Sequence, residues 1–289
     1  MTDYIKNINL NDNSILTLRN LTSDADISSV DINQVTGEYL LTKPLNTDGR
    51  IGGNLWLCPA SEQLSGVNTI TIIKNFIQTG SLYYPYDARF DYARNKIWIC
   101  DTGNDRVVKI DKNKLDIVDV IVDELIYPHA IAVNYNTGGI FIKAYNDIGL
   151  NNGIVYSLKS DGQLNYSFVY YIDTSESSSS SSISLSSSWS SSSFDTFISL
   201  PSPNSIAYDH VRGRVWWGSK NKVYMFDEKT NQISTLDLSS NNLYFAYSIS
   251  IEYETGNAFV VCGDIHEETY LAQIFRDNNV FLGKAYLAE

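Results

Sequence analysis

The stretch DARFDYARNKIWICDTGNDRVVKID, residues 87–111, holds short apolar runs separated by polar turns. Ala88 and Phe90 are the alternate apolar residues before its first turn, and the run Ile-Trp-Ile-Cys follows that turn at 97–100. Alternation is typical of a half-buried strand, and a run that is apolar on both faces is typical of a strand between two sheets. The stretch therefore predicts antiparallel strands joined by tight turns.

The same pattern recurs five times along the chain with a matching internal spacing. The five segments span residues 29–41, 87–99, 130–142, 205–217 and 248–260. At one fixed offset in each turn stand Gly37, Asn95, Gly138, Gly213 and Gly256. Glycine and asparagine are the residues that most readily adopt positive φ, which a hairpin turn requires. The repeat therefore has a stereochemical cause.

Each repeat predicts a first strand with alternate apolar residues, and a second hairpin that completes four strands. The apolar pairs on the first strands are Val30/Ile32, Ala88/Phe90, Ile131/Val133, Ile206/Tyr208 and Ile249/Ile251. A strand-rich repeat of about 40 residues is typical of propeller blades. The chain is thus predicted to be all-β, a single β-propeller domain over residues 1–289 with five to six four-stranded antiparallel blades whose innermost strands carry these pairs.

One blade also resembles a known family. After Pro85, the run Asp87-Ala-Arg-Phe-Asp and the continuation through Ile97-Trp-Ile-Cys to Asp111 resemble an NHL repeat. The resemblance implies a propeller, and NHL-like propellers include ligand-binding scaffolds and a minority of enzymes.

The turn at 101–106 is the most family-like string in the chain, and we expect it to be structural. Asp101 is expected to accept amide protons of the turn, Gly103 to take a positive φ, and Arg106 to pair with a carboxylate.

Residues 1–26 resemble the outer hairpin of the other units, yet no inner hairpin precedes them. Five inner hairpins therefore stand against as many as six outer ones. Two interpretations stay open. The N-terminal hairpin is either an incomplete sixth blade, completed by another chain, or a closing element that covers an exposed sheet edge.

A serine-rich insert, residues 175–195, separates the third and fourth full blades. Fifteen of the nineteen residues from 175 to 193 are serine, a composition that favours a flexible insert. Ile183, Leu185 and Trp189 interrupt it and are predicted to contact another chain of a larger assembly, because three apolar anchors do not offset the ordering entropy of the tract alone. The insert resembles those of bacteriophage and environmental viral proteins, which implies a virion role.

Composition restricts the partners. The formal charge of −12 and the isoelectric point near 4.6 argue against nucleic acid and anionic membranes as partners. The sequence shows no signal peptide and no transmembrane run, so the expected location is a virion if the protein is viral and otherwise the cytoplasm. Cys58, Cys100 and Cys262 are predicted to be buried reduced thiols.

The loops before the first strands should meet at the mouth of a propeller channel. The candidate ligand-binding residues there are Tyr86, Asp87, His129, Asn204 and Tyr247, with Ser28 at the matching position of the first repeat. Such a set can bind a glycan or a small polar ligand, or it can simply cap the channel. It offers too few oxygen ligands for calcium, and His129 lacks a second acid or base, so we expect no catalytic residue, metal or cofactor.

Three functional hypotheses follow. The first is a non-enzymatic structural or interaction protein, a component of a viral (bacteriophage) particle that contacts other protein chains. The second is a propeller lyase or lactonase that uses His129, Asp87 and Asn204. The third is a carbohydrate- or receptor-binding head that uses Tyr86 and Tyr247.

Overall fold

The computed structural model describes most of the chain, and its residues fall into two compact units, Met1–Val120 and Ile121–Glu289. The described residues are 3–9, 14–21, 27–33, 35–45, 51–58, 71–73, 82–114, 117–122, 125–145, 152–171, 185–186, 205–219, 221–263, 269–274 and 281–286. No helix among them is long and apolar enough to cross a membrane.

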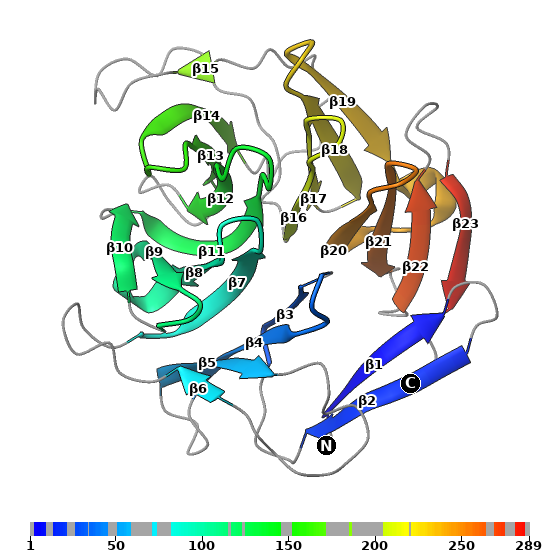
Figure 1. Ribbon diagram of the computed structural model, residues 1–289. Helices are drawn as coiled ribbons and strands as arrows, with labels where there is room; N and C mark the ends of the chain where they lie inside the picture. The colour runs from blue at the N-terminus through cyan, green and yellow to red at the C-terminus, as the bar shows by residue number, and fades with distance from the viewer. Residues whose placement is uncertain are drawn as a thin grey trace. The chain divides into compact units, whose positions relative to one another are not determined.

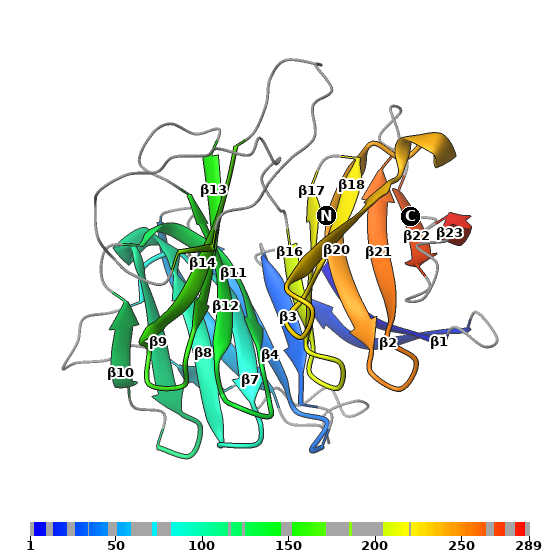
Figure 2. The same cartoon turned by 90° about the horizontal axis from the view of Figure 1, so that it is seen from above.

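The first unit holds two four-stranded antiparallel sheets and a separate hairpin (Figure 1). The hairpin pairs β1 (Asp3–Asn9) with β2 (Ser14–Leu21). The first sheet consists of β3 (Ser29–Ile32), β4 (Tyr39–Leu45), β5 (Ile51–Cys58) and β6 (Thr71–Ile73). The second consists of β7 (Pro85–Asp91), β8 (Lys96–Asp101), β9 (Arg106–Asp111) and β10 (Ile117–Val122), which lie side by side in Figure 2.

The second unit holds three antiparallel sheets, each built in chain order. The first consists of β11 (Ile126–Val133), β12 (Ile140–Tyr145), β13 (Asn152–Leu158), β14 (Leu164–Tyr171) and the two-residue β15 (Leu185–Ser186). The next consists of β16 (Ser205–Asp209), β17 (Arg214–Ser219), β18 (Lys222–Asp227) and β19 (Gln232–Asp237). The last consists of β20 (Phe245–Glu252), β21 (Asn257–Gly263), β22 (Thr269–Ile274) and β23 (Phe281–Tyr286).

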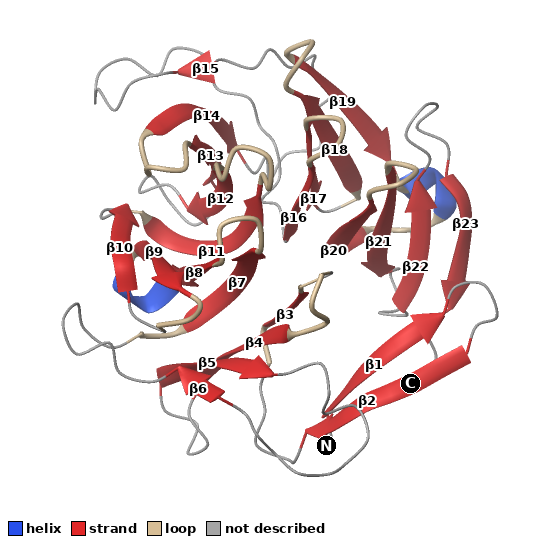
Figure 3. Ribbon diagram, viewed as in Figure 1, coloured by secondary structure: helices blue, strands red, loops and turns tan. Residues whose placement is uncertain are grey.

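The described residues are therefore all-β, as predicted. Figure 3 shows strands throughout, interrupted by short 3₁₀ turns at η2 (Thr102–Asn104) and η3 (Ser239–Asn241). Up-and-down sheets of four strands are the unit from which propellers are built. The number of blades stays a prediction.

The turn chemistry of the repeat is confirmed. The predicted turn residues take positive φ, at 73° for Gly37, 54° for Asn95, 78° for Gly138, 72° for Gly213 and 79° for Gly256. In three of the turns the first residue also accepts two backbone amides through its Oδ1 atom. These first residues are Asn33, Asn134 and Asp209. Such side-chain acceptors fix tight turns, so each first hairpin is locally determined.

The cores lie between neighbouring sheets of the same unit. In the second unit, Trp217 packs in the cluster that joins β11–β13 to β16–β18, and Trp216 packs in the cluster with β20–β22. Successive residues of one strand thus fill opposite cores, which explains why the second strands are apolar on both faces. In the first unit, Leu40 and Leu55 pack against Ala88 and Phe90.

The predicted pairs on the first strands are buried in four of the five repeats. The prediction is wrong for β3, where Val30 and Ile32 are 47% and 49% exposed. The opposite face of β3 contacts β7 instead, because Asp31 Oδ2 accepts the Phe90 amide at 2.8 Å and Ser29 Oγ accepts the Ala88 amide at 3.4 Å. The polar face of β3 therefore turns towards β7, because its hydrogen bonds to that strand stabilise this orientation, and the apolar face stays partly exposed.

The three cysteines are buried free thiols, as predicted. The β1–β2 hairpin forms a sheet of its own. Whether it completes a blade with another chain or covers an edge therefore stays a prediction.

Candidate functional site

β-Bulges redirect tyrosines at the beginning of three first strands. The pairing register skips Tyr86 between Pro85 and Asp87 in β7, and Tyr247 between Ala246 and Ser248 in β20. In β11 it shifts between Ile126 and Ala130, around Tyr127. A bulge bends its strand and turns side chains to a new direction. Accordingly Tyr86, Tyr127 and Tyr247 are 37%, 54% and 43% exposed.

We call residues 82–86, 125–129 and 243–247 the lead-in segments. Each begins with a leucine that is at most 6% exposed and anchors the segment in a core. Tyr84 and Tyr127 precede prolines and take φ of 55° and 49°. Left-handed backbone costs about 1–2 kcal/mol for a side chain with a Cβ atom. Buried leucines on one side and paired strands on the other hold these tyrosines in that conformation.

In the first unit, the lead-in segment is fixed through the Tyr86 carbonyl. This oxygen accepts the Ser28 hydroxyl at 2.6 Å and the Thr42 hydroxyl at 3.0 Å. Tyr83 is also 41% exposed, and the rings of Tyr84 and Tyr86 lie 6.1 Å apart. A group of tyrosines therefore presents partly exposed rings on a rigid backbone.

Asp87 lies directly beyond Tyr86 but is only 3% exposed. Its Oδ1 atom forms an ion pair with Arg89 at 3.2 Å, and Arg89 also donates to the Val30 carbonyl at 3.0 Å. Burial raises the pKa of the neighbouring Asp31, and the charge of Asp87 adds to that rise. Asp87 thus belongs to a charged contact between β3 and β7 that supports the lead-in segment.

In the second unit, His129 supports the segment of Tyr127. Its Nδ1–H donates to the Tyr127 carbonyl at 2.8 Å, which fixes the neutral tautomer. Burial, and the nearby charge of Lys143, lower the pKa of His129 to about 3. Lys143, on β12, is 1% exposed, and burial lowers its pKa to about 7. A buried amine with a lowered pKa therefore lies close to a neutral imidazole.

The predicted site residues are placed as follows. Tyr86 and Asp87 are adjacent in the first unit, and His129 and Tyr247 lie on first strands of the second. Asn204, Ile183 and Trp189 lie outside the described residues. The backbone of Leu185 pairs with Phe168 of β14 in the same chain.

Three observations were not predicted from sequence: the bulges, the exposure of Tyr127 and the burial of Lys143. The exposure of Tyr127 could have been predicted, because the motif Leu-x-Tyr-Pro stands at both 82–85 and 125–128. Among the described residues, no group of three or more His, Cys, Asp or Glu side chains could hold a metal ion.

The turn at 101–106 is structural, with one correction. Asp101 is fully buried and accepts the Tyr83 amide, the Asn104 side chain and the Arg106 guanidinium, each at 2.7 Å. Gly103 does not have the predicted positive φ; Asp105 does, at 49°. Gly103 is needed instead for a close approach, because a Cβ atom there would lie 2.2 Å from the Tyr83 ring.

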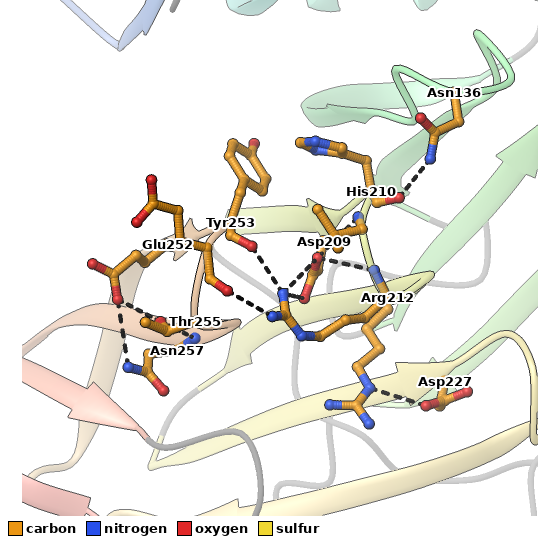
Figure 4. A network of polar contacts seen from close by, with 12 residues as sticks. Asn136, Asp209, His210, Arg212, Asp227, Glu252, Tyr253, Thr255 and Asn257 are labelled. Carbon is orange, nitrogen blue, oxygen red and sulfur yellow. Dashed lines mark hydrogen bonds and ion pairs between the residues drawn. The ribbon is translucent and has the colours of Figure 1, made fainter.

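Figure 4 shows a polar network at the turns of the second unit. Arg212 pairs with Asp209 at 3.2 Å and donates to the carbonyls of Tyr253 and Glu254, each at 2.9 Å. Asn136 donates to the His210 carbonyl at 2.6 Å. The first turns of three consecutive sheets are thereby tied together. In each antiparallel sheet these turns lie at the opposite end from the lead-in segments.

Comparison with known proteins supports the fold. No protein-family model matches the sequence, and no curated protein matches it. A solved structure entitled "Crystal structure of Nidogen/Laminin Complex" is similar over 99% of this chain and 91% of that chain, with a TM-score of 0.66 and 12% identity. Hydrazine synthase from Kuenenia stuttgartiensis is similar over 68% of this chain and 47% of that chain, with a TM-score of 0.48 and 10% identity.

Four-stranded antiparallel sheets in chain order, together with the first likeness, define the class of fold as a β-propeller. An identity of 12% shows the fold alone. In all, 848 chains of solved structures match, so the likeness does not select one function.

Proposed function

We propose that this chain is a non-enzymatic interaction domain that binds a protein partner through its lead-in segments. The observation that carries the proposal is the set of bulges that turn Tyr86, Tyr127 and Tyr247 outward. Among the tyrosines whose side-chain exposure the structure describes, the exposed ones are Tyr83, Tyr86, Tyr127 and Tyr247, and all four lie in lead-in segments. Tyrosine is enriched at protein interfaces, because its ring gives a large contact area at low entropic cost and its hydroxyl gives a hydrogen bond.

Rigidity supports this role. Buried leucines, the Tyr86 carbonyl contacts and the His129 bond to Tyr127 hold the segments before any partner arrives. Preorganised side chains lose less freedom on binding. The similar solved structure is itself titled as a complex of two proteins, which agrees with this use of the fold.

The chemistry of the candidate catalytic residues favours binding over turnover. A histidine with a pKa of about 3 is a weak base, and its Nδ1–H is committed to the Tyr127 carbonyl. Asp87 is paired with Arg89. We therefore expect His129→Ala to abolish no measurable lyase or lactonase turnover. A metal or substrate held jointly by His129 and Asp87 would overturn this assignment.

The more specific proposal is that the protein belongs to a viral particle. The interrupted poly-serine insert at residues 175–195 supports this proposal. Deletion of residues 177–193 is then expected to weaken incorporation into that assembly while the isolated domain stays folded. Wild-type incorporation of the deletion variant would remove this proposal and leave the interaction role untouched.

The interaction role is tested by site-specific photo-cross-linking in cells that make the protein. A photoreactive phenylalanine analogue is placed at Tyr86, Tyr127 or Tyr247, and in control proteins at Val35 or Val211. The control side chains are 75% and 55% exposed, in turns at the other end of their sheets. We expect discrete cross-linked products containing a second protein from the tyrosine positions only. Equal products from the controls, or none from the tyrosines, would reject the proposal.

A further inference from the structure

A pocket of about 370 Å³ lies in the second unit, away from the lead-in segments. Its lining comes from the sheet β11–β15 and from the β18–β19 turn of the next sheet. Small-molecule sites commonly span about 300–1,000 Å³, so this pocket suits a small ligand.

A carboxylate is held in place on one side of the pocket. The Glu228 amide donates to the Gly213 carbonyl at 2.9 Å, and the Glu228 Oε2 atom accepts the Tyr208 hydroxyl at 2.5 Å. Tyr208 in turn accepts the Asn134 side-chain amide at 2.8 Å and stacks on Phe141 with ring centroids 4.9 Å apart. A chain of bonds through buried groups thus fixes the direction of this negative charge.

A lysine of the sheet β11–β15 lines the same pocket and faces it with a positive charge. Lys159 stands in the β13–β14 turn and is exposed, so its ammonium can move towards a bound group. Ser157, which is 3% exposed, and Asn165 add neutral hydrogen-bonding groups. Phe141 and Leu158 supply apolar wall.

The wall depends on a close backbone approach. A Cβ atom at Gly139 would lie 2.7 Å from the Leu158 carbonyl oxygen. The β11–β12 turn can therefore meet the end of β13 only with glycine at this position, and both segments line the pocket.

We propose that this pocket binds a small zwitterion of the amino-acid type. Its ammonium group pairs with Glu228 and its carboxylate with Lys159, while Ser157 and Asn165 bond the remaining polar atoms. Opposite charges on two sheets are complementary to a ligand that carries both. This site is separate from the protein interface proposed above.

The test uses the full-length protein and the twenty L-amino acids, each titrated by ligand-observed NMR. We expect saturable binding of at least one of them. The C-terminal amide and the N-acetyl derivative of the best ligand each lack one charge and should bind at least about tenfold more weakly, which corresponds to about 1.4 kcal/mol. Equal binding of either derivative, or binding of glucose and galactose in place of any amino acid, would overturn the proposal.

Two variants and a matched control locate the binding. Glu228→Gln keeps an amide oxygen for the Tyr208 hydroxyl, and Lys159→Gln changes an exposed residue, so both should fold. Each should weaken binding about tenfold, whereas Lys229→Gln, an exposed neighbour outside the pocket lining, should change it less than twofold. Unchanged affinity in both pocket variants would place the binding elsewhere, and absence of binding to the wild type would reject the site.

Discussion

Lys143 carries an amine in surroundings that disfavour its charge, because the residue is only 1% exposed. Burial lowers the pKa of this amine from its ordinary value of 10.5 to about 7. The folded protein therefore binds fewer protons than the unfolded chain between these two pH values. Since stability rises with pH wherever the unfolded state binds more protons, unfolding should become harder from pH 7 to pH 10.

We expect Lys143→Met to be more stable than the wild type at pH 7, by roughly 2–4 kcal/mol. The variant keeps the length of the side chain and removes the charge that burial disfavours. Denaturant melts at pH 7 and pH 10 measure the effect, and the gain should shrink towards pH 10. A less stable variant at pH 7, or a pH-independent difference, would show that the buried ammonium is compensated.

Asp101 is the buried acceptor at the centre of the turn at 101–106. Asp101→Ala should lower the free energy of unfolding by about 3 kcal/mol, because three donors lose a buried acceptor. Asp161→Ala is the matched control, since Asp161 is exposed and bonds only the Gln163 amide among the contacts described; it should cost about 1 kcal/mol or less. Similar losses for the two variants would contradict the role of Asp101 as the centre of its turn.

At the scale of elements, the turns of the first hairpins combine a backbone requirement with a contact between sheets. Gly213 and Gly256 both need positive φ, but their surroundings differ. A Cβ atom at Gly213 would meet its nearest neighbour at 3.7 Å, whereas one at Gly256 would lie 2.6 Å from Arg212 Nε. Arg212 is the residue that ties the β16–β17 turn to the β20–β21 turn.

We therefore expect Gly213→Ala to cost about 1 kcal/mol, and Gly256→Ala about 2 kcal/mol or more. The excess at Gly256 comes from displaced Arg212, so it should vanish in an Arg212→Ala background. Thermal or urea melts of the four single and double variants give the coupling energy. Equal costs of the two glycine substitutions in the wild-type background would show that a Cβ atom at residue 256 does not disturb the Arg212 contact between these turns.

Sequence predicts these elements unevenly, for physical reasons. The turns were predictable because glycine and asparagine at positive φ are local requirements, and so were the second strands, because Trp216 and Trp217 fill opposite cores. The bulges could not be predicted, because the register of a strand is set by its partner strand and not by its own sequence. The exposed Val30 and Ile32 were missed because Asp31 bonds β7, a contact between separate sheets.

At the scale of the whole molecule, a net charge of −12 keeps like chains apart, so association should depend on specific contacts. On the proposed function, the bulged tyrosines of each unit would provide such contacts, and their partly exposed rings would leave water when a partner binds. Their substitution should therefore affect assembly far more than folding.

Sedimentation velocity of native material tests this claim most directly, comparing the wild type with the triple variant Tyr86→Ser, Tyr127→Ser and Tyr247→Ser. We predict that the wild type sediments together with a protein partner, and that the variant sediments as the free 32.5 kDa chain while keeping the wild-type circular dichroism spectrum and a cooperative melt. A folded variant that still sediments with the partner, or a wild type that sediments alone under native conditions, would contradict the account.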